Sequence, residues 1–291
     1  MQSQILVNGL LLGGLYGLVT VGFSLVWGVT NVVNIAHSSF ITLGAYGAWF
    51  LHSRLGLGPF TSLPIVMSGM FLVGFVIQHQ VINRVIRHGL VMTLIITFGI
   101  DLILTNAVLL AFSADYRAVK LPYSSSGLTL GSIQVPYLRL SIFVLALVIT
   151  ALLATFLSRT RSGRAIRATA LNQQAALLMG VSINRVYAMT YGVAAAIAGA
   201  AGVLMSTLYS FGPEVGRGFL TRAFVITVLG GLGSLPGAIL GGVLLGLIEA
   251  VTTVSLGAGY TEVMAFAVLV AILAFRPQGL LGKRFYGGAK S

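Results

Sequence analysis

Four polar side chains lie within strongly apolar stretches of the sequence: Asn34, His37, Asp101 and Glu249. Asn34 and His37 are three positions apart, a spacing that a helix would bring to one face. Neutral polar groups in such a setting either line the path of a polar solute or form hydrogen bonds within the protein, and both roles stay open. Asp101 and Glu249 are the acidic residues expected to lie deepest.

A glycine-rich stretch offers a second kind of chemistry. It reads Gly-Gly-Leu-Gly-Ser-Leu-Pro-Gly, and its candidate site residues are Gly230, Gly231, Gly233 and Ser234. Ser234 is a suitable N-cap and Pro236 is tolerated in a first helical turn, which predicts a helix starting near Leu235. Its free backbone N–H groups could bind an anion such as a carboxylate. The alternative is that the glycines only allow two helices to cross closely.

Sequence signatures of catalysis do not occur in the chain. It has no H-E-x-x-H, G-x-S-x-G or G-x-x-x-x-G-K-[ST] motif, which argues against a metalloprotease, a nucleophile-elbow hydrolase and a nucleotide-binding protein. The absence of Cys excludes thiolate catalysis, thiolate metal sites and disulfides. We therefore expect no catalytic residue, no metal site and no cofactor.

The elements that must position these residues are membrane helices. Of the 291 residues, 57% are hydrophobic and 8% are charged, and the mean hydropathy is +1.00. Soluble domains are roughly 45–50% apolar and about 25% charged, so water is not the main solvent of this chain. No charged segment precedes the first apolar stretch, from Ile5 to Val29, so we expect a retained span rather than a signal peptide.

About eight apolar segments predict an all-α, polytopic transmembrane protein that forms a single domain over residues 1–291. The segments cover residues 5–29, 38–51, 62–82, 90–112, 140–157, 186–209, 223–254 and 261–275. Segment 38–51 is short for a span, whereas 223–254 is too long and contains the glycine-rich stretch. This pattern predicts a broken or re-entrant helix that is covered by protein or lines a wet cavity.

The net charge of +12 follows from membrane topology rather than nucleic-acid binding. The basic residues occur in short tracts between apolar runs, without a basic face interleaved with aromatics. Tracts 84–88, 159–185 and 276–290 contain most of the 17 Lys and Arg residues and are assigned to the cytoplasm. The N-terminus then faces outward, and the remaining basic residues, including Arg217 and Arg222, are counted on the outer side.

Asp101 should lie near the middle of the membrane, because it is about 12 residues, or ~18 Å of helix, into its apolar segment. An unpaired carboxylate there is unfavourable by several kcal/mol, so it must be protonated, paired or solvated by a cavity. A proton or sodium site of a self-sufficient secondary transporter is one interpretation. A structural or path-lining group is the other.

The loop from Arg159 to Arg185 is too long for a tight turn and is expected to contain a helix. Its arginines repeat at three-residue spacing, and an apolar stripe precedes Gly180. The arginines are Arg161, Arg164 and Arg167, and the stripe is Leu171, Ala175 and Leu178. A short cytoplasmic helix of this kind needs a protein partner, unless it lies on the anionic inner leaflet.

This loop resembles the EAA loop of ATP-binding-cassette importer permeases. Gln174-Ala175-Ala176 followed by Leu-Leu-Met and Gly180 is similar to the family's Glu-Ala-Ala and Gly, with Gln174 in place of Glu. In that family the loop forms a coupling helix that docks into a groove of the cytoplasmic ATPase. The resemblance implies that 159–185 is a coupling loop, with roles for Arg164, Arg167, Gln174, Ala175, Ala176 and Gly180.

Two further stretches resemble the branched-chain amino acid importer permeases of the LivH type. They are residues 31–37, Asn-Val-Val-Asn-Ile-Ala-His, and residues 228–238 together with Glu249. The resemblance covers essentially the whole chain, and a start close to the first span suits this subunit better than the longer LivM type. Urea, short-chain amide and other amino acid importers share both stretches and remain alternatives, because Ser38-Ser39 replaces a usual Gly-Glu.

The resemblance implies a multi-pass permease of the bacterial inner membrane with four kinds of partner. These are a LivM-like second permease, two cytoplasmic ATPase subunits, a periplasmic or extracellular solute-binding protein, and membrane lipid. It also implies a substrate pathway through Asn34, His37, Gly230, Gly231, Gly233, Ser234 and Glu249.

Overall fold

The computed structural model describes residues 2–119, 121, 126–130, 133–276 and 278–281. Within this part of the chain, seven helices are long and apolar enough to cross a membrane, which confirms a polytopic helical protein. They are α1 (Gln2–Thr30), α3 (Pro59–Ile77) with its continuation through α4 (Asn83–Val85), α5 (Leu90–Phe112), α6 (Tyr137–Arg159), α9 (Ile183–Met205), α11 (Leu235–Ser255) and α12 (Thr261–Phe275).

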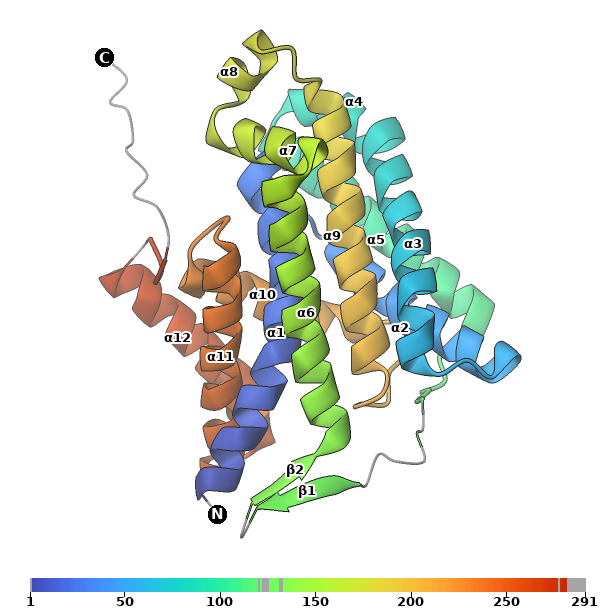
Figure 1. Cartoon of the computed structure of the whole chain (residues 1–291), viewed down its shortest axis with the longest axis vertical. Coiled ribbons are helices and arrows are strands. Elements are labelled where there is room, and N and C mark those ends of the chain that lie inside the picture. The colour runs from blue at the N-terminus through green and yellow to red at the C-terminus, as the bar shows by residue number, and fades with distance from the viewer. Residues whose placement is uncertain (1, 120, 122–125, 131–132, 277, 282–291) are drawn as a thin grey trace.

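Helices α1 and α9 form the centre of the bundle, and the other spans surround them (Figure 1). In each of these two helices, 89% of the most apolar stretch is buried, against 11% to 28% for α3, α5, α6 and α12. The outer helices expose Leu, Ile, Val and Phe side chains. Such a surface is stable only against lipid or other apolar groups, as expected for a membrane protein.

Two shorter helices, α2 (His37–Leu55) and α10 (Val215–Gly230), begin inside the bundle. The start of α2 is level with the middle of α1, because Nε2 of His37 lies 3.0 Å from the Val19 carbonyl oxygen. The first turn of α10 meets the first two turns of α2, where the Gly216 N–H donates to Oγ1 of Thr42 at 3.2 Å. A Cβ atom at Gly216 would overlap the Ser38 carbonyl oxygen, so this approach requires glycine.

The predicted interruption of segment 223–254 is confirmed as the turn between α10 and α11. Gly231 and Gly233 have φ of +100° and +74°, conformations that favour glycine. Oγ of Ser234 accepts from the Gly237 N–H at 3.1 Å, which confirms the predicted N-cap.

This turn lies near the C-terminal end of α1, where Gly233 packs against Gly28. The last carbonyl groups of α10, those of Leu229 and Gly230, accept from the N–H groups of Leu280 and Leu281 at 2.8 and 3.0 Å. The backbone groups that the break leaves free are therefore bonded by a later part of the chain.

Glycines also set the contact between α1 and α11. Cβ atoms added at Gly13 or Gly246 would lie within 3 Å of the facing backbone, so the two helices pack at very short range. The four-residue glycine spacing therefore serves packing within the chain.

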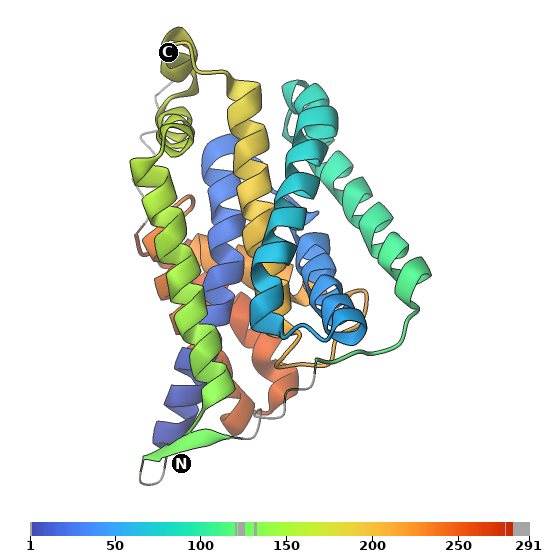
Figure 2. The same ribbon diagram turned by 45° about the vertical axis from the view of Figure 1, so that its right-hand side comes forward.

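The two ends of the bundle differ in structure (Figure 2). Helices α7 (Arg161–Leu171) and α8 (Gln173–Leu178) cover the end opposite the N-terminus, whereas strands β1 (Gly127–Leu130) and β2 (Ile133–Pro136) form an antiparallel hairpin near the N-terminus. The sequence analysis did not predict this hairpin. It expected one helix in 159–185, and this was wrong: Asn172, with φ −158°, separates two. Of the basic residues used for the topology, Lys120, Lys283, Arg284 and Lys290 lie outside the described residues.

Candidate functional site

Asp101 is the centre of a buried polar cluster between α2 and α5. It lies at the midpoint of α5 and is only 2% exposed. The hydroxyl of Ser38 donates to Oδ1 of Asp101 at 2.5 Å, the hydroxyl of Ser39 also donates to Oδ1, and Ser39 lies 3.3 Å from Oγ1 of Thr105. The carboxylate also sits beside the N-terminal turn of α2, where the helix dipole favours negative charge.

Arg217 connects this cluster to the exposed surface. Its Nε lies 3.9 Å from Oδ2 of Asp101, and its Nη1 donates to Oε1 of Glu214 at 3.0 Å. The guanidinium of Arg217 thus lies level with the middle of α5, and the assignment of Arg217 to the outer side stays a prediction. The sequence analysis left Asp101 protonated, paired or solvated by a cavity, and the structure shows it paired with Arg217.

Glu249 belongs to a second, closed cluster. Its Oε2 accepts from the Tyr16 hydroxyl at 2.6 Å, and its Oε1 accepts from Nε of Arg222 at 2.8 Å. The guanidinium carbon of Arg222 is 5.5 Å from the centre of the Tyr16 ring. Arg222 therefore belongs to helix α10 and contacts Glu249 within the bundle, and its assignment to the outer side stays a prediction. These contacts join α1, α10 and α11, and a pathway role for Glu249 stays a prediction.

Asn34 and His37 do not share a helical face, contrary to the sequence expectation, because Asn34 precedes α2 in non-helical backbone. Oδ1 of Asn34 accepts from the Tyr191 hydroxyl at 2.7 Å, and the His37 ring packs edge-on against Phe23. Both side chains are buried, and each has one nitrogen, Nδ2 of Asn34 and Nδ1 of His37, without a hydrogen-bond partner among the described residues. Each of the two residues is thus held by contacts within the protein and keeps one nitrogen available for a further hydrogen bond.

The glycine turn borders a cavity of about 280 Å³ at the end of the bundle that carries α7. Gly233 and Leu235 line it from the turn, Ser24 and Gly28 line it from α1, and Arg167 lines it from α7. The structure thereby brings together Gly233, predicted for the pathway, and Arg167, predicted for coupling. Gly230 lies apart from this cavity, in close contact with Gly237 of α11.

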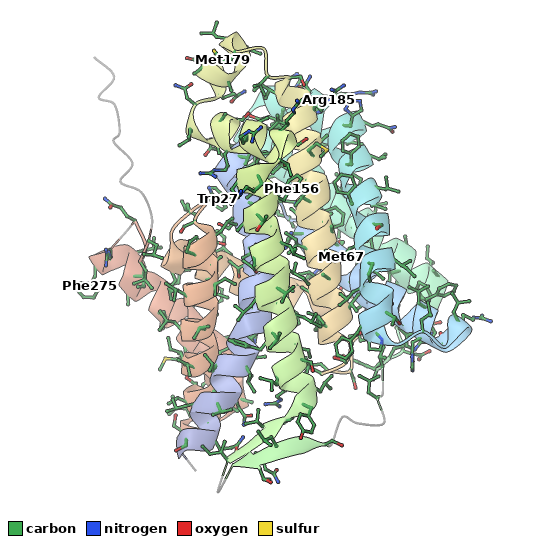
Figure 3. The ribbon with its side chains drawn as sticks, in the orientation of Figure 1. Trp27, Met67, Phe156, Met179, Arg185 and Phe275 are labelled. Atoms are coloured by element: carbon green, nitrogen blue, oxygen red, sulfur yellow. The ribbon has the colours of Figure 1, made fainter. Side chains whose placement is uncertain are left out.

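The loop 159–185 presents apolar side chains at its far end. Leu171, Leu178 and Met179 are 74%, 88% and 84% exposed, and Met179 marks the tip of α8, away from the bundle (Figure 3). Gln174 and Ala175 are exposed whereas Ala176 is buried. The exposed residue Arg164 donates to the Arg159 carbonyl at 3.3 Å, and Gly180 ends this segment with φ +80°.

Comparisons with known proteins identify the family. The family model described as the branched-chain amino acid transport system permease component matches residues 5–273. The chain belongs to this permease family. The permease protein BraD of Pseudomonas aeruginosa is 35% identical, over 96% of this chain and 95% of its own. LivH of Escherichia coli is 31% identical, with the same two coverages.

This permease is also related to LivM of Escherichia coli, at 26% identity over 92% of this chain and 68% of LivM. The relatives thus include both members of a permease pair. No solved structure matches the chain. As a permease component, the chain is a multi-pass translocation subunit and not an enzyme. Its polar clusters therefore serve the passage of solute, the coupling to partner subunits or the packing of its helices.

The sequence analysis missed the polar face of α5, although a signal was present. The buried residues of α5 are Thr93, Thr97, Asp101, Thr105 and Val108. All but the last are polar and recur every four residues, a helical spacing, while the other faces are apolar. This pattern assigns a polar stripe to the inside of a membrane span and predicts a polar partner for it.

Proposed function

We propose that this permease is the translocation subunit of an ATP-binding-cassette importer in the bacterial inner membrane, and that its solutes are branched-chain amino acids. Both BraD and LivH carry branched-chain amino acid transport in their names, and each aligns with 96% of the chain. The alternatives of urea, short-chain amides or secondary transport have no comparable support.

The observation that carries the proposal is the exposed apolar end of α7 and α8. A helix that binds the inner leaflet turns its apolar side chains toward the membrane. Met179 instead lies at the outermost tip, away from the bundle (Figure 3), and the preceding residue, Leu178, is 88% exposed. Exposed apolar groups in this position favour docking to a cytoplasmic protein. We assign 159–185 as the coupling loop, within one permease domain formed by residues 1–291. Two ATPase subunits are the proposed cytoplasmic partners.

Further partners follow from the same proposal. The relation to LivM supports a LivM-like second permease in a heterodimer. A solute-binding protein would dock at the end with the β hairpin, and membrane lipid would cover the apolar outer helices. Coupling residues are Arg164, Arg167, Gln174, Ala175, Ala176 and Gly180, and the pathway residues assigned from the sequence keep that role as predictions.

A charge placed in the apolar end tests the coupling. In the complete transporter, Ala175→Asp or Leu178→Asp should lower leucine uptake by at least about tenfold, because an unpaired charge in an interface is strongly unfavourable. Basal ATP hydrolysis and the amount of permease in the membrane should persist. Uptake of radiolabelled leucine and phosphate release are the measurements.

Gln173→Asp is the matched control, since this residue is also exposed on α8 but at its first turn, where a carboxylate is favourable. It should transport normally. Normal uptake in both the Ala175 and Leu178 variants would contradict docking by this loop. Leucine uptake by the chain alone, driven by a proton gradient without ATP, would instead establish a secondary transporter.

A further inference from the structure

A cavity of about 520 Å³ lies between the outer half of α5 and the segment that joins α9 to α10. Its lining includes Asn106, Leu109, Phe211, Glu214, Val215 and Arg217. This volume is within the range of sites that hold small organic solutes. The cavity is separate from the glycine turn and from the Glu249 cluster.

The cavity extends from near the midpoint of α5 to the C-terminal end of this helix, which the predicted topology assigns to the outer side. Arg217 reaches Asp101 at the midpoint of α5, and Thr105 and Asn106 lie one turn further toward the outer end of that helix. Ala114 and Tyr116, which also line the cavity, follow that end. Figure 2 shows α5 running obliquely to α9 toward the end with the β hairpin.

The charges at this depth are exposed. The side chain of Arg217 is 46% exposed and that of Glu214 is 69% exposed. Exposure of these groups to hydrocarbon would be strongly unfavourable, so this surface must face water or protein. Exposed charges of this kind within a membrane line solute or ion paths, where water offsets the free energy that contact with hydrocarbon would cost.

The lining also matches the chemistry of an aliphatic amino acid. Arg217 is shared between Glu214 at 3.0 Å and Asp101 at 3.9 Å, so its guanidinium keeps donors for a further acceptor. Asp101 holds it from the buried side, where Ser38 and Ser39 occupy Oδ1. The rest of the lining includes apolar groups, among them Leu109 and Val215.

We propose that this cavity is the solute site of the permease. Arg217 binds the carboxylate of the amino acid, Glu214 binds its ammonium group, and Leu109 and Val215 pack against its aliphatic side chain. Asp101 is a positioning residue that retains Arg217 when the ammonium group draws Glu214 away. The inference rests on the proposed function and adds to it the site at which the solute is held.

Cysteine labelling tests whether the cavity is wet and binds the solute. In cells that express the complete, otherwise Cys-free permease, Asn106→Cys should react with a charged, membrane-impermeant methanethiosulfonate added outside. Leucine at millimolar concentration should slow this reaction at least about threefold, as expected when most sites are occupied. Ala107→Cys is the matched control, because it is exposed at the same depth but points about 100° away. It should not react.

The labelling outcomes separate the two proposals. Absence of reaction at Asn106→Cys, or a reaction that leucine leaves unchanged in a transporter that takes up leucine, overturns the solute site alone. A parent transporter that takes up no branched-chain amino acid overturns the proposed function.

Uptake kinetics test Arg217 itself. Arg217→Gln should lower leucine uptake at least about tenfold through loss of a charge-assisted hydrogen bond, and Arg217→Lys should restore part of it. Arg139→Gln, which removes an arginine bonded to Asn8 away from the cavity, is the control and should transport normally. Normal uptake by Arg217→Gln, with the parent amount of permease in the membrane, overturns the assignment.

Discussion

Helix α10 contributes an arginine to each of two acidic clusters. One of the two ion pairs is enclosed by the bundle, whereas the other is open to a cavity. Arg222 meets Glu249 at 2.8 Å, and the two side chains are 21% and 6% exposed. Arg217 meets Asp101 at 3.9 Å, and their side chains are 46% and 3% exposed. The first pair is completed by Tyr16 from the same chain, whereas the second borders a cavity.

This difference indicates which acid is structural. In the closed pair, each charge has its partners within the bundle, so the cluster fixes α1, α10 and α11 relative to one another. In the open pair, the acid is satisfied by hydroxyl groups and the arginine keeps free donors. An incompletely paired charge at mid-membrane is costly, and a ligand that pairs with it gains affinity.

Breaking the closed pair should have the largest effect. Glu249→Gln leaves the partly buried Arg222 without its acidic partner, and such a change costs about 3–5 kcal/mol in fully buried pairs. We expect the amount of folded permease in the membrane to fall sharply, measured by immunoblotting and size-exclusion chromatography. Replacing both members by Met should restore much of it, because two apolar groups need no partner.

A double replacement that removes both charges of the open pair gives the contrast. Asp101→Asn with Arg217→Gln should preserve the amount of permease but not leucine uptake. The comparison would be reversed if leucine uptake required the charges of Glu249 and Arg222 but tolerated the loss of those of Asp101 and Arg217.

A smaller effect is expected where the two short helices meet. Gly216→Ala places a Cβ against the Ser38 carbonyl, next to the open cluster, and such overpacking costs about 1–3 kcal/mol. Thermal stability of the purified permease should decrease, and leucine uptake should fall with it. Gly218→Ala is the control, since its added Cβ would meet only the flexible Nη1 of Arg222 at 3.4 Å. Equal stability of the two variants would show that α2 and α10 are not rigidly packed.

The smallest effect is expected for Asp101→Asn alone. The amide keeps an acceptor for the serine hydroxyls but loses the charge that holds Arg217. Leucine uptake should fall about tenfold per assembled transporter, mainly in KM, because Asp101 acts through Arg217. An unchanged KM with a lower maximal rate would point to a role in movement rather than in holding the solute.

Much of the fold was predictable because the membrane imposes it. Hydrocarbon requires about 20 apolar residues per span, so composition and run length located the spans, and the predicted 90–112 and 261–275 agree with α5 and α12. Local turn chemistry was equally direct at Ser234, whose side chain can reach the N–H of its own first turn. Both depend on short-range physics that a stretch of sequence contains in full.

The candidate site could be predicted only in part. Asp101 and Glu249 were identified as buried acids because carboxylates are rare in apolar segments. Their partners could not be, because Arg217 and Arg222 occur near a segment boundary, and a linear count of charges assigned them to the outer side. The polar face of α5 was readable from its spacing, but its meeting with Ser38 and Ser39 was not.

The sequence by itself determined that this chain crosses a membrane several times, where its helix break occurs and which permease family it resembles. Tertiary structure alone decided that α2 and α10 start side by side within the bundle, and that one acid is enclosed while the other borders a cavity. The physical reason is that hydrophobic burial is additive along the chain, whereas the pairing of a charge depends on which distant residues reach it.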